Sequence, residues 1–168
     1  QILGQVDPET TLFVICSKSF STLETLSNAV IARKWLEDSK GGQLAVARQF
    51  VAVSANHEAL DSFGVAREMQ FSTWDWVGGR YSIWSSMGLS LALAVGWEHF
   101  EAMLNGAHAM DQHFSTTPSA DNLPVVLALL GIWNRNMLCT SGHAILPYDY
   151  HLRWLPTYLQ QLEMESNG

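Results

Sequence analysis

A short apolar run, a turn rich in hydroxyl side chains and an amphipathic segment follow one another near the start of the chain and most constrain its fold. Residues 11–16 read Thr-Leu-Phe-Val-Ile-Cys, and their length and β-branched content are typical of a buried parallel strand. Residues 22–38 carry apolar side chains at the spacing of one helix face, and residues 17–22 form the turn between them. This order places the turn at the carboxyl end of a strand, which is the edge where open α/β sheets bind ligands.

The remainder of the chain predicts further strands that alternate with helices. Two more strands are expected over residues 49–54 and 68–71, with a short helix from His57 to Phe63 that Gly64 ends. Later in the chain we expect helices over 82–95, 97–105, 106–114, 124–139 and 150–161, and a last strand over 143–147. The pattern predicts an α/β fold, a three-layer α/β/α sandwich with a parallel sheet, in a single domain that covers residues 1–168.

Composition restricts the kind of partner. The chain is 48% apolar and 15% charged, as compact globular domains are, and its formal net charge of −7 makes nucleic acid a poor partner. No apolar run reaches the length of a membrane span, so no membrane partner is expected. Cys16 and Cys139 lie in apolar stretches and predict buried, reduced thiols in a cytosolic protein. Because the chain lacks a first methionine and stops at Gly168, we expect a segment of a longer protein.

The hydroxyl-rich turn is the first candidate binding site. It consists of Ser17, Lys18, Ser19, Phe20, Ser21 and Thr22. A phosphate group needs convergent donors, and hydroxyls together with the free N–H groups of a helix start supply them without a basic surface. The turn is not a P-loop, since the glycine pattern of that motif is absent. A capping turn that binds no ligand is the alternative.

The second candidate is the stretch 74–82, which reads Trp-Asp-Trp-Val-Gly-Gly-Arg-Tyr-Ser. Two successive glycines allow backbone to approach a ligand closely, because no Cβ is in the way. Arg80, directly after Gly79, is expected at a helix start, where its guanidinium and the helix N–H groups can face one anion. The alternative is a plain turn with a surface arginine.

The third candidate is the pair Gln161 and Glu165, expected just beyond the last helix in a Ser-Asn-Gly turn. A partly buried carboxylate there can act as a general base, whereas a solvated glutamate is the default interpretation. We expect no metal, because His108, Asp111 and His113 do not share one helix face and lack a further ligand. Neither cysteine has a neighbouring base that would mark a nucleophile.

Taken together, these stretches resemble the glucose-6-phosphate isomerase (phosphoglucose isomerase) family. The similarity covers essentially the whole chain and rests on residues 17–22, 74–82 and 164–168, with further likeness over 104–114, 128–133 and 146–149. The resemblance implies a sugar isomerase (SIS) domain that needs no metal or cofactor. It also implies reversible interconversion of glucose 6-phosphate and fructose 6-phosphate through an enediolate, by a cytoplasmic homodimer that serves glycolysis and gluconeogenesis.

The resemblance also assigns roles to residues. The turn 17–22 would hold the phosphate, chiefly through the hydroxyls of Ser17, Ser19 and Thr22. Ser19 and Ser21 stand where the family more often has threonine, and Leu23 replaces a common glutamine, which puts one polar contact near the loop in doubt.

The remaining roles concern the reacting carbons. Glu165 would move a proton between C1 and C2 of the opened sugar, and Arg80 would stabilise the enediolate. Gly79 and Gln161 would line the sugar site. Trp74 and Trp76 would pack around the arginine and hold it in place.

The family's other functional groups are expected outside these residues. They are a glycine-serine loop before the segment, and after it a histidine from the partner subunit and a late lysine. We therefore expect the isolated segment to lack turnover. A non-catalytic sugar-phosphate-binding SIS domain is the alternative from another class, and Arg80 together with Glu165 favours the enzyme. An extracellular, cytokine-like role, known for some family members, has no support in this sequence.

Overall fold

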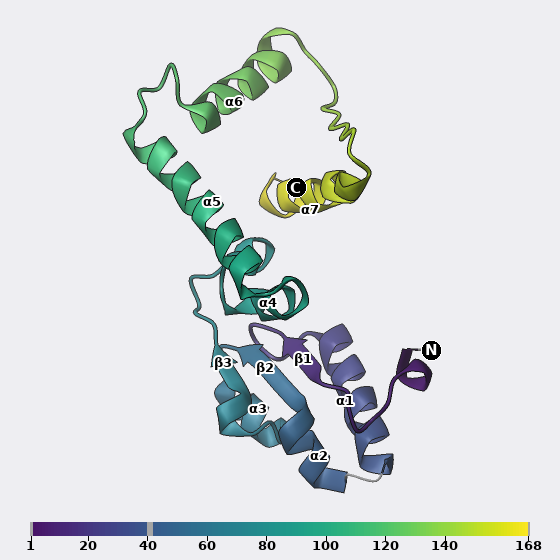
Figure 1. Ribbon diagram of the computed structural model, residues 1–168. Helices are drawn as coiled ribbons and strands as arrows, with labels where there is room; N and C mark the ends of the chain where they lie inside the picture. The colour runs from purple at the N-terminus through teal and green to yellow at the C-terminus, as the bar shows by residue number, and fades with distance from the viewer. Residues whose placement is uncertain (1, 40–41, 168) are drawn as a thin grey trace. The chain divides into compact units, whose positions relative to one another are not determined.

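The computed structural model describes residues 2–39 and 42–167, apart from the side chains of residues 42–45, 165 and 167. The chain forms two compact units, Gln1–Ala94 and Val95–Gly168, and each is described by itself (Figure 1). The expectation of one domain over 1–168 stays a prediction. The first unit contains β1 (Phe13–Cys16), α1 (Leu23–Asp38), α2 (Gly42–Gln49), β2 (Phe50–Ser54), α3 (His57–Phe63) and β3 (Gln70–Ser72), and short 3₁₀ helices at Ile2–Gln5, Arg67–Met69, Gly79–Trp84 and Ser86–Gly88.

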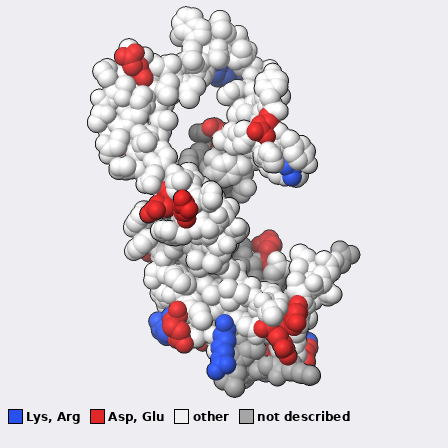
Figure 2. Space-filling view, viewed as in Figure 1, with Lys and Arg blue, Asp and Glu red and all other residues white. Residues whose placement is uncertain are grey.

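The second unit is helical in its described residues. After α4 (Leu89–Val95) at the junction come α5 (Trp97–Thr116), α6 (Leu123–Ile132), a π-helical turn (Trp133–Met137), a 3₁₀ turn (Tyr150–Leu152) and α7 (Leu155–Asn167). The surface over α6 carries no charged side chain, and Leu127 and Leu130 are exposed on it (Figure 2). No described helix combines the length and the hydropathy that crossing a bilayer requires.

The three strands form a parallel sheet, as predicted, and their order is β1-β2-β3. Phe13 pairs with Phe50, and Val53 pairs with both Cys16 and Phe71. Every residue of the central strand β2 is buried, which is typical of a parallel strand that is covered on both faces. This parallel sheet therefore agrees with the expected α/β fold.

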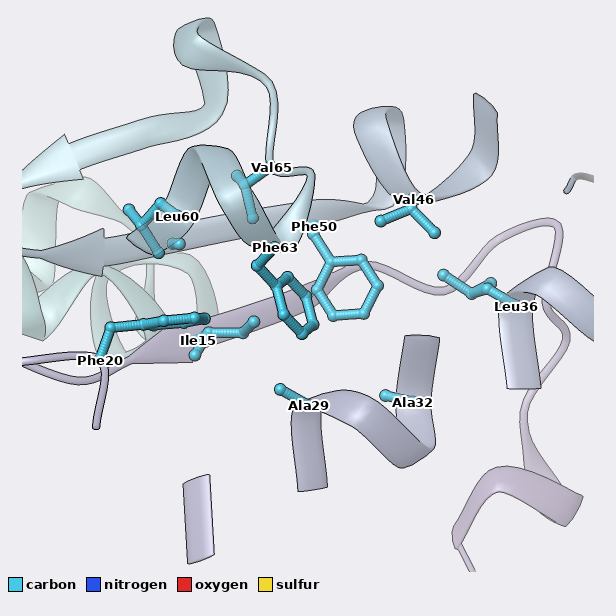
Figure 3. Packing of buried hydrophobic residues seen from close by; sticks show 11 residues of the cluster. Ile15, Phe20, Ala29, Ala32, Leu36, Val46, Phe50, Leu60, Phe63 and Val65 are labelled. Atoms are coloured by element: carbon cyan, nitrogen blue, oxygen red, sulfur yellow. The ribbon is translucent and has the colours of Figure 1, made fainter. Parts of the chain in front are cut away.

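One face of the sheet holds the main hydrophobic core (Figure 3). Its members come from α1, α2, α3, the strands β1 and β2, and two loops: Ile15, Phe20, Ala29, Ala32, Leu36, Val46, Phe50, Ala52, Leu60, Phe63 and Val65. The aromatic rings meet edge to face, with the centroids of Phe50 and Phe63 5.7 Å apart. Helices α1 and α3 thus form one outer layer.

The opposite face is covered by the segment that follows β3. Cys16 alternates with Ile15 along β1, so the two side chains point to opposite faces. The Cys16 thiol donates to the carbonyl of Met87 at 3.7 Å, which places the 3₁₀ turn Ser86–Gly88 over this second face. Layers on both faces make the three-layer arrangement that the sequence predicts.

Local sequence sets the bounds of α3 as predicted. The Asn56 side chain accepts a hydrogen bond from the backbone N–H of Ala59 and so caps the helix start. Gly64 ends the helix with φ of 96°, a left-handed conformation that glycine adopts without a Cβ clash. These two residues explain why the short helix is read correctly from sequence.

The expected helix over 82–95 is wrong in its first half. The structure has two 3₁₀ helices, Gly79–Trp84 and Ser86–Gly88, and only then α4. The Ser85 hydroxyl donates to the carbonyl of Ser82 and accepts from the N–H of Met87. These local bonds compete with the α-helical ladder, which is why serine-rich apolar segments depart from a simple periodicity.

Three later expectations are also wrong. The helices over 97–105 and 106–114 are one helix, α5, because a single glycine such as Gly106 costs only about 1 kcal/mol in a helix and does not end it. No strand forms over 143–147, since the sheet ladders of the described residues involve only β1, β2 and β3. Helix α7 continues to Asn167, so Glu165 lies within the last helix and not beyond it, and the Ser166 hydroxyl bonds the Leu162 carbonyl within the helix.

The cysteine expectation is half right. Both thiols are free, as predicted. Cys16 is half-buried, but Cys139 is exposed, with a left-handed φ of 53° just after the π-helical turn. Its apolar neighbours therefore did not predict burial.

The core predicts a large difference between two identical substitutions. Leu60→Ala should lower the free energy of unfolding by about 2–5 kcal/mol, because Leu60 is fully buried and its removal leaves a cavity. Leu23→Ala, at a leucine that is 75% exposed, should cost less than about 0.5 kcal/mol. Urea denaturation measures both, and equal effects would contradict this description of the core.

Candidate functional site

The hydroxyl-rich loop 17–22 leaves β1 at the carboxyl edge of the sheet and is held by its carbonyl groups. The carbonyl of Lys18 accepts from the N–H of Ala55 at 2.8 Å and from the Ser54 hydroxyl at 3.0 Å. The carbonyl of Ser19 accepts from the Asn56 side chain at 3.2 Å. Because carbonyl oxygens repel anions, their use within the protein leaves the donors of the loop for a ligand.

Phe20 anchors the loop in the core. Its φ is 51°, an uncommon left-handed value for a residue with a side chain. The ring is buried and packs edge to face on Phe63, with centroids 5.5 Å apart. Any contact of Phe20 with a ligand is therefore through its backbone.

The hydroxyl groups of the loop provide the donors. Ser17 is 6% exposed, and its hydroxyl has no hydrogen-bond partner among the described residues. Buried polar atoms are nearly always paired, so this hydroxyl is available for a ligand. Ser19 and Ser21 lie with their hydroxyls 2.6 Å apart, and Thr22 precedes α1 without a capping bond from its side chain.

These donors meet the start of a long helix. Helix α1 has sixteen residues, and its first N–H groups have no partners within the helix. An anion at the loop is therefore stabilised by hydroxyls and by the helix start together. This arrangement supports the predicted anion site.

The thiol beside the loop adds no charge to it. Burial raises the pKa of Cys16, so this thiol stays neutral at physiological pH. A neutral thiol next to Ser17 leaves the electrostatic attraction of the loop for an anion unopposed.

The arginine stretch begins with a tight turn. The N–H of Val77 donates to the carbonyl of Trp74 at 3.0 Å, and Val77 is buried. The 3₁₀ helix Gly79–Trp84 follows, so Arg80 lies at a helix start as predicted, although the helix is not α-helical. Arg80 is half-buried, with its guanidinium carbon 5.4 Å from the centre of the Tyr81 ring.

The glycine and the tryptophans of this stretch have different surroundings. A Cβ added at Gly79 would meet no atom within 4 Å, so open space lies beside this backbone as a ligand requires. Trp74 and Trp76 stack on each other with centroids 5.6 Å apart and are 53% and 79% exposed. Their expected packing around Arg80 stays a prediction.

Lys18 joins the two candidate stretches. Its ammonium donates to the carbonyl of Asp75 and, at 3.2 Å, to the carbonyl of Val77. The structure thus brings the hydroxyl loop and the arginine stretch together within the first unit. The sequence patterns do not reveal this link, because the partners lie 57 and 59 residues away along the chain.

A second buried hydroxyl near the sheet edge was missed. Thr73 follows β3 directly, and its N–H donates to the carbonyl of Ser54 at 3.1 Å. It is buried, and its hydroxyl has no hydrogen-bond partner in residues 2–39 and 42–167. Its position at the carboxyl end of a predicted strand is the signal that could have found it.

The other predicted site residues lie in the second unit. Gln161 is exposed on α7, and Glu165 follows it by four residues in the same helix, which places both on one helix face. The side chain of Glu165 lies outside the described residues. No group of three potential metal ligands occurs among the residues that the structure describes.

The fold and the loop define an α/β fold with a candidate anion-binding site at the carboxyl edge of a parallel sheet. A family model described as phosphoglucose isomerase matches residues 1–168. The chain belongs to the phosphoglucose isomerase family.

The relatives are much longer than this chain. It is 56% identical to a glucose-6-phosphate isomerase of Dechloromonas aromatica and 55% identical to one of Neisseria meningitidis, over 99% of this chain but only 32% and 30% of theirs. A crystal structure of a glucose-6-phosphate isomerase from Chlamydia trachomatis matches with a TM-score of 0.88 and 39% identity, over 99% of this chain and 32% of that one. A hypothetical protein of Thermus thermophilus matches with a TM-score of 0.79 and 30% identity, over 98% of this chain and 39% of that one.

The loop geometry predicts the effect of removing one hydroxyl. Ser17→Ala should raise the Kd for inorganic phosphate roughly 10- to 100-fold, because a hydrogen bond to a charged group contributes about 1.5–3 kcal/mol. Calorimetry on the longer protein that contains these residues measures the change. Ser62→Ala is the control, because the exposed Ser62 hydroxyl bonds only a carbonyl of its own helix. An unchanged Kd for the Ser17 variant would contradict the site.

Proposed function

We propose that these residues are one segment of a glucose-6-phosphate isomerase, which interconverts glucose 6-phosphate and fructose 6-phosphate. The buried Ser17 hydroxyl in the loop before α1 carries the proposal. It has no partner among the described residues, and it is a donor that a phosphate would satisfy. Family membership and the names of the curated relatives support it. The activity belongs to the longer protein, since this chain spans about a third of those relatives.

Phosphate binding at the loop positions the substrate. The hydroxyls of Ser17, Ser19 and Thr22 and the N–H groups of the helix start take the dianion, and Ser21 supports Ser19 through their close hydroxyl pair. Lys18 and Phe20 complete the loop. Binding energy at this remote group then orients the sugar carbons for reaction.

Isomerisation of the aldose to the ketose removes a hydrogen from C2, adds one at C1 and moves the carbonyl from C1 to C2. In the opened aldose, Glu165 removes the proton from C2, and the electron pair of that bond forms the C1–C2 double bond while the carbonyl oxygen gains negative charge. O1 takes up a proton, and the C2 hydroxyl gives one up as the carbonyl forms at C2. The carboxyl group, whose proton exchanges with solvent, delivers a proton to C1, so no oxidant or reductant is needed.

Arg80 stabilises the negative charge of the enediolate. Its guanidinium is permanently positive and half-buried, so the interaction is less screened than at an open surface. Gly79 and Gln161 line the sugar, with the open space beside Gly79 admitting the substrate next to backbone.

The whole protein is proposed to be a cytoplasmic homodimer that serves glycolysis and gluconeogenesis. The uncharged, exposed side chains of α6 support burial of this helix against further protein, either the rest of the polypeptide or a second subunit. The net charge of −7 argues against a nucleic-acid partner. The isolated segment should show no turnover in a coupled assay.

Replacing the proposed base gives the decisive test of this function. In the full-length protein, Glu165→Gln should lower kcat by roughly 10²- to 10⁴-fold, the usual contribution of general acid–base catalysis. Calorimetry should show that fructose 6-phosphate still binds. Glu101→Gln, at an exposed glutamate of α5, is the control and should keep kcat within about twofold of the wild type.

Two results would reject the proposal. A Glu165 variant with unchanged kcat would show that another group moves the proton. Sugar-phosphate binding without any isomerisation by the wild-type protein would instead identify a non-catalytic sugar-phosphate-binding SIS domain.

A further inference from the structure

The side chain of Lys18 links the two candidate stretches of the first unit. Its ammonium lies within hydrogen-bond distance of two backbone carbonyls, those of Asp75 and Val77, the second at 3.2 Å. A lysine has three donors and no acceptor, so two of its three N–H groups are used here. The side chain thus reaches away from the hydroxyls of its own loop.

Both acceptors lie in the turn that carries the arginine. This turn is closed by the bond from Val77 to Trp74, and the 3₁₀ helix with Arg80 begins two residues after Val77. The tryptophans of the turn stack on each other and are largely exposed, so they leave the turn without deep packing. The ammonium and the buried Val77 side chain therefore fix the turn to the sheet edge together with the bond from the Thr73 N–H to the Ser54 carbonyl.

The other end of the link is equally fixed. The carbonyl of Lys18 accepts from both Ser54 and Ala55, at the end of the buried strand β2. The Lys18 backbone is thus hydrogen-bonded at one end of the side chain, and its ammonium is bonded to two carbonyls at the other end. These bonds set the distance that the side chain spans. Displacement of the turn by even about 1 Å can cost up to 10²-fold in rate when it moves a catalytic group.

We infer that Lys18 is a positioning residue that acts through Arg80. It holds the turn that carries Arg80 at a fixed distance from the phosphate loop. This inference rests on the proposed function and differs from a direct phosphate contact of the ammonium. Substrate held by its phosphate then presents its reacting carbons to a guanidinium at a set distance. Lys18 should therefore affect the transition state more than ground-state binding.

A double-mutant cycle tests this role in the full-length protein. Lys18→Met keeps the apolar stem and removes the ammonium; it should lower kcat on the order of 10- to 100-fold while KM changes less than about threefold. In an Arg80→Ala background the same change should alter kcat less than about twofold, because its effect passes through Arg80.

Further variants separate the possible failures. Lys34→Met, at an exposed lysine of α1 that pairs with Asp38, should match the wild type. Lys18→Arg should recover part of kcat, since it restores a cation that donates to carbonyls. If Lys18→Met does not fold, Lys18→Gln takes its place in the cycle. A kcat loss that persists in the Arg80→Ala background, or a loss confined to KM, would overturn the inference. An Arg80→Ala protein with normal kcat would instead reject the proposed function.

Discussion

The burial of β2 between two parallel neighbours is the interaction on which the rest of the first unit depends. Every side chain of this strand is buried, with Phe50 and Ala52 in the main core. Because β1 and β3 pair with it in parallel, both neighbours end at the same edge of the sheet. The last residue of β2, Ser54, is also polar and buried, and its hydroxyl is satisfied by the carbonyl of Lys18. The strand therefore holds both the core and the loop that is proposed to bind phosphate.

A protein with a net charge of −7 has to attract a dianion by local means. The proposed site has such means at the sheet edge: hydroxyls, a helix start and the half-buried Arg80. Burial raises the pKa of Cys16 and keeps this neighbour neutral, so that no thiolate opposes the anion. Local donors can thus outweigh an unfavourable overall charge, because exposed charges more than about 10 Å away are strongly screened at physiological salt.

Features set by neighbours in sequence were predictable, and features set by distant partners were not. The strand–turn–helix order near the start and the caps of α3 follow from local patterns, and the structure agrees with them. The segment 79–88 was misread because serine hydroxyls bond nearby backbone, and the turn expected at Glu165 became helix. The contact of Lys18 with Asp75 and Val77, and the stacking of Trp74 on Trp76, depend on tertiary placement that spacing alone does not encode. The resemblance identified the loop and arginine residues, but only the structure shows how they are joined.

Hydrogen exchange at the reacting carbons tests the central claim most directly, namely that Glu165 moves a proton through an enediolate that Arg80 stabilises. The full-length protein is incubated with fructose 6-phosphate in D₂O until the two sugar phosphates equilibrate, and both are analysed by mass spectrometry and NMR. The account predicts solvent deuterium at C1 of the ketose and C2 of the aldose, and incorporation that is slower by roughly 10²- to 10⁴-fold with Glu165→Gln. Equilibrated sugar phosphates without deuterium, or undiminished exchange in the Glu165 variant, would contradict it.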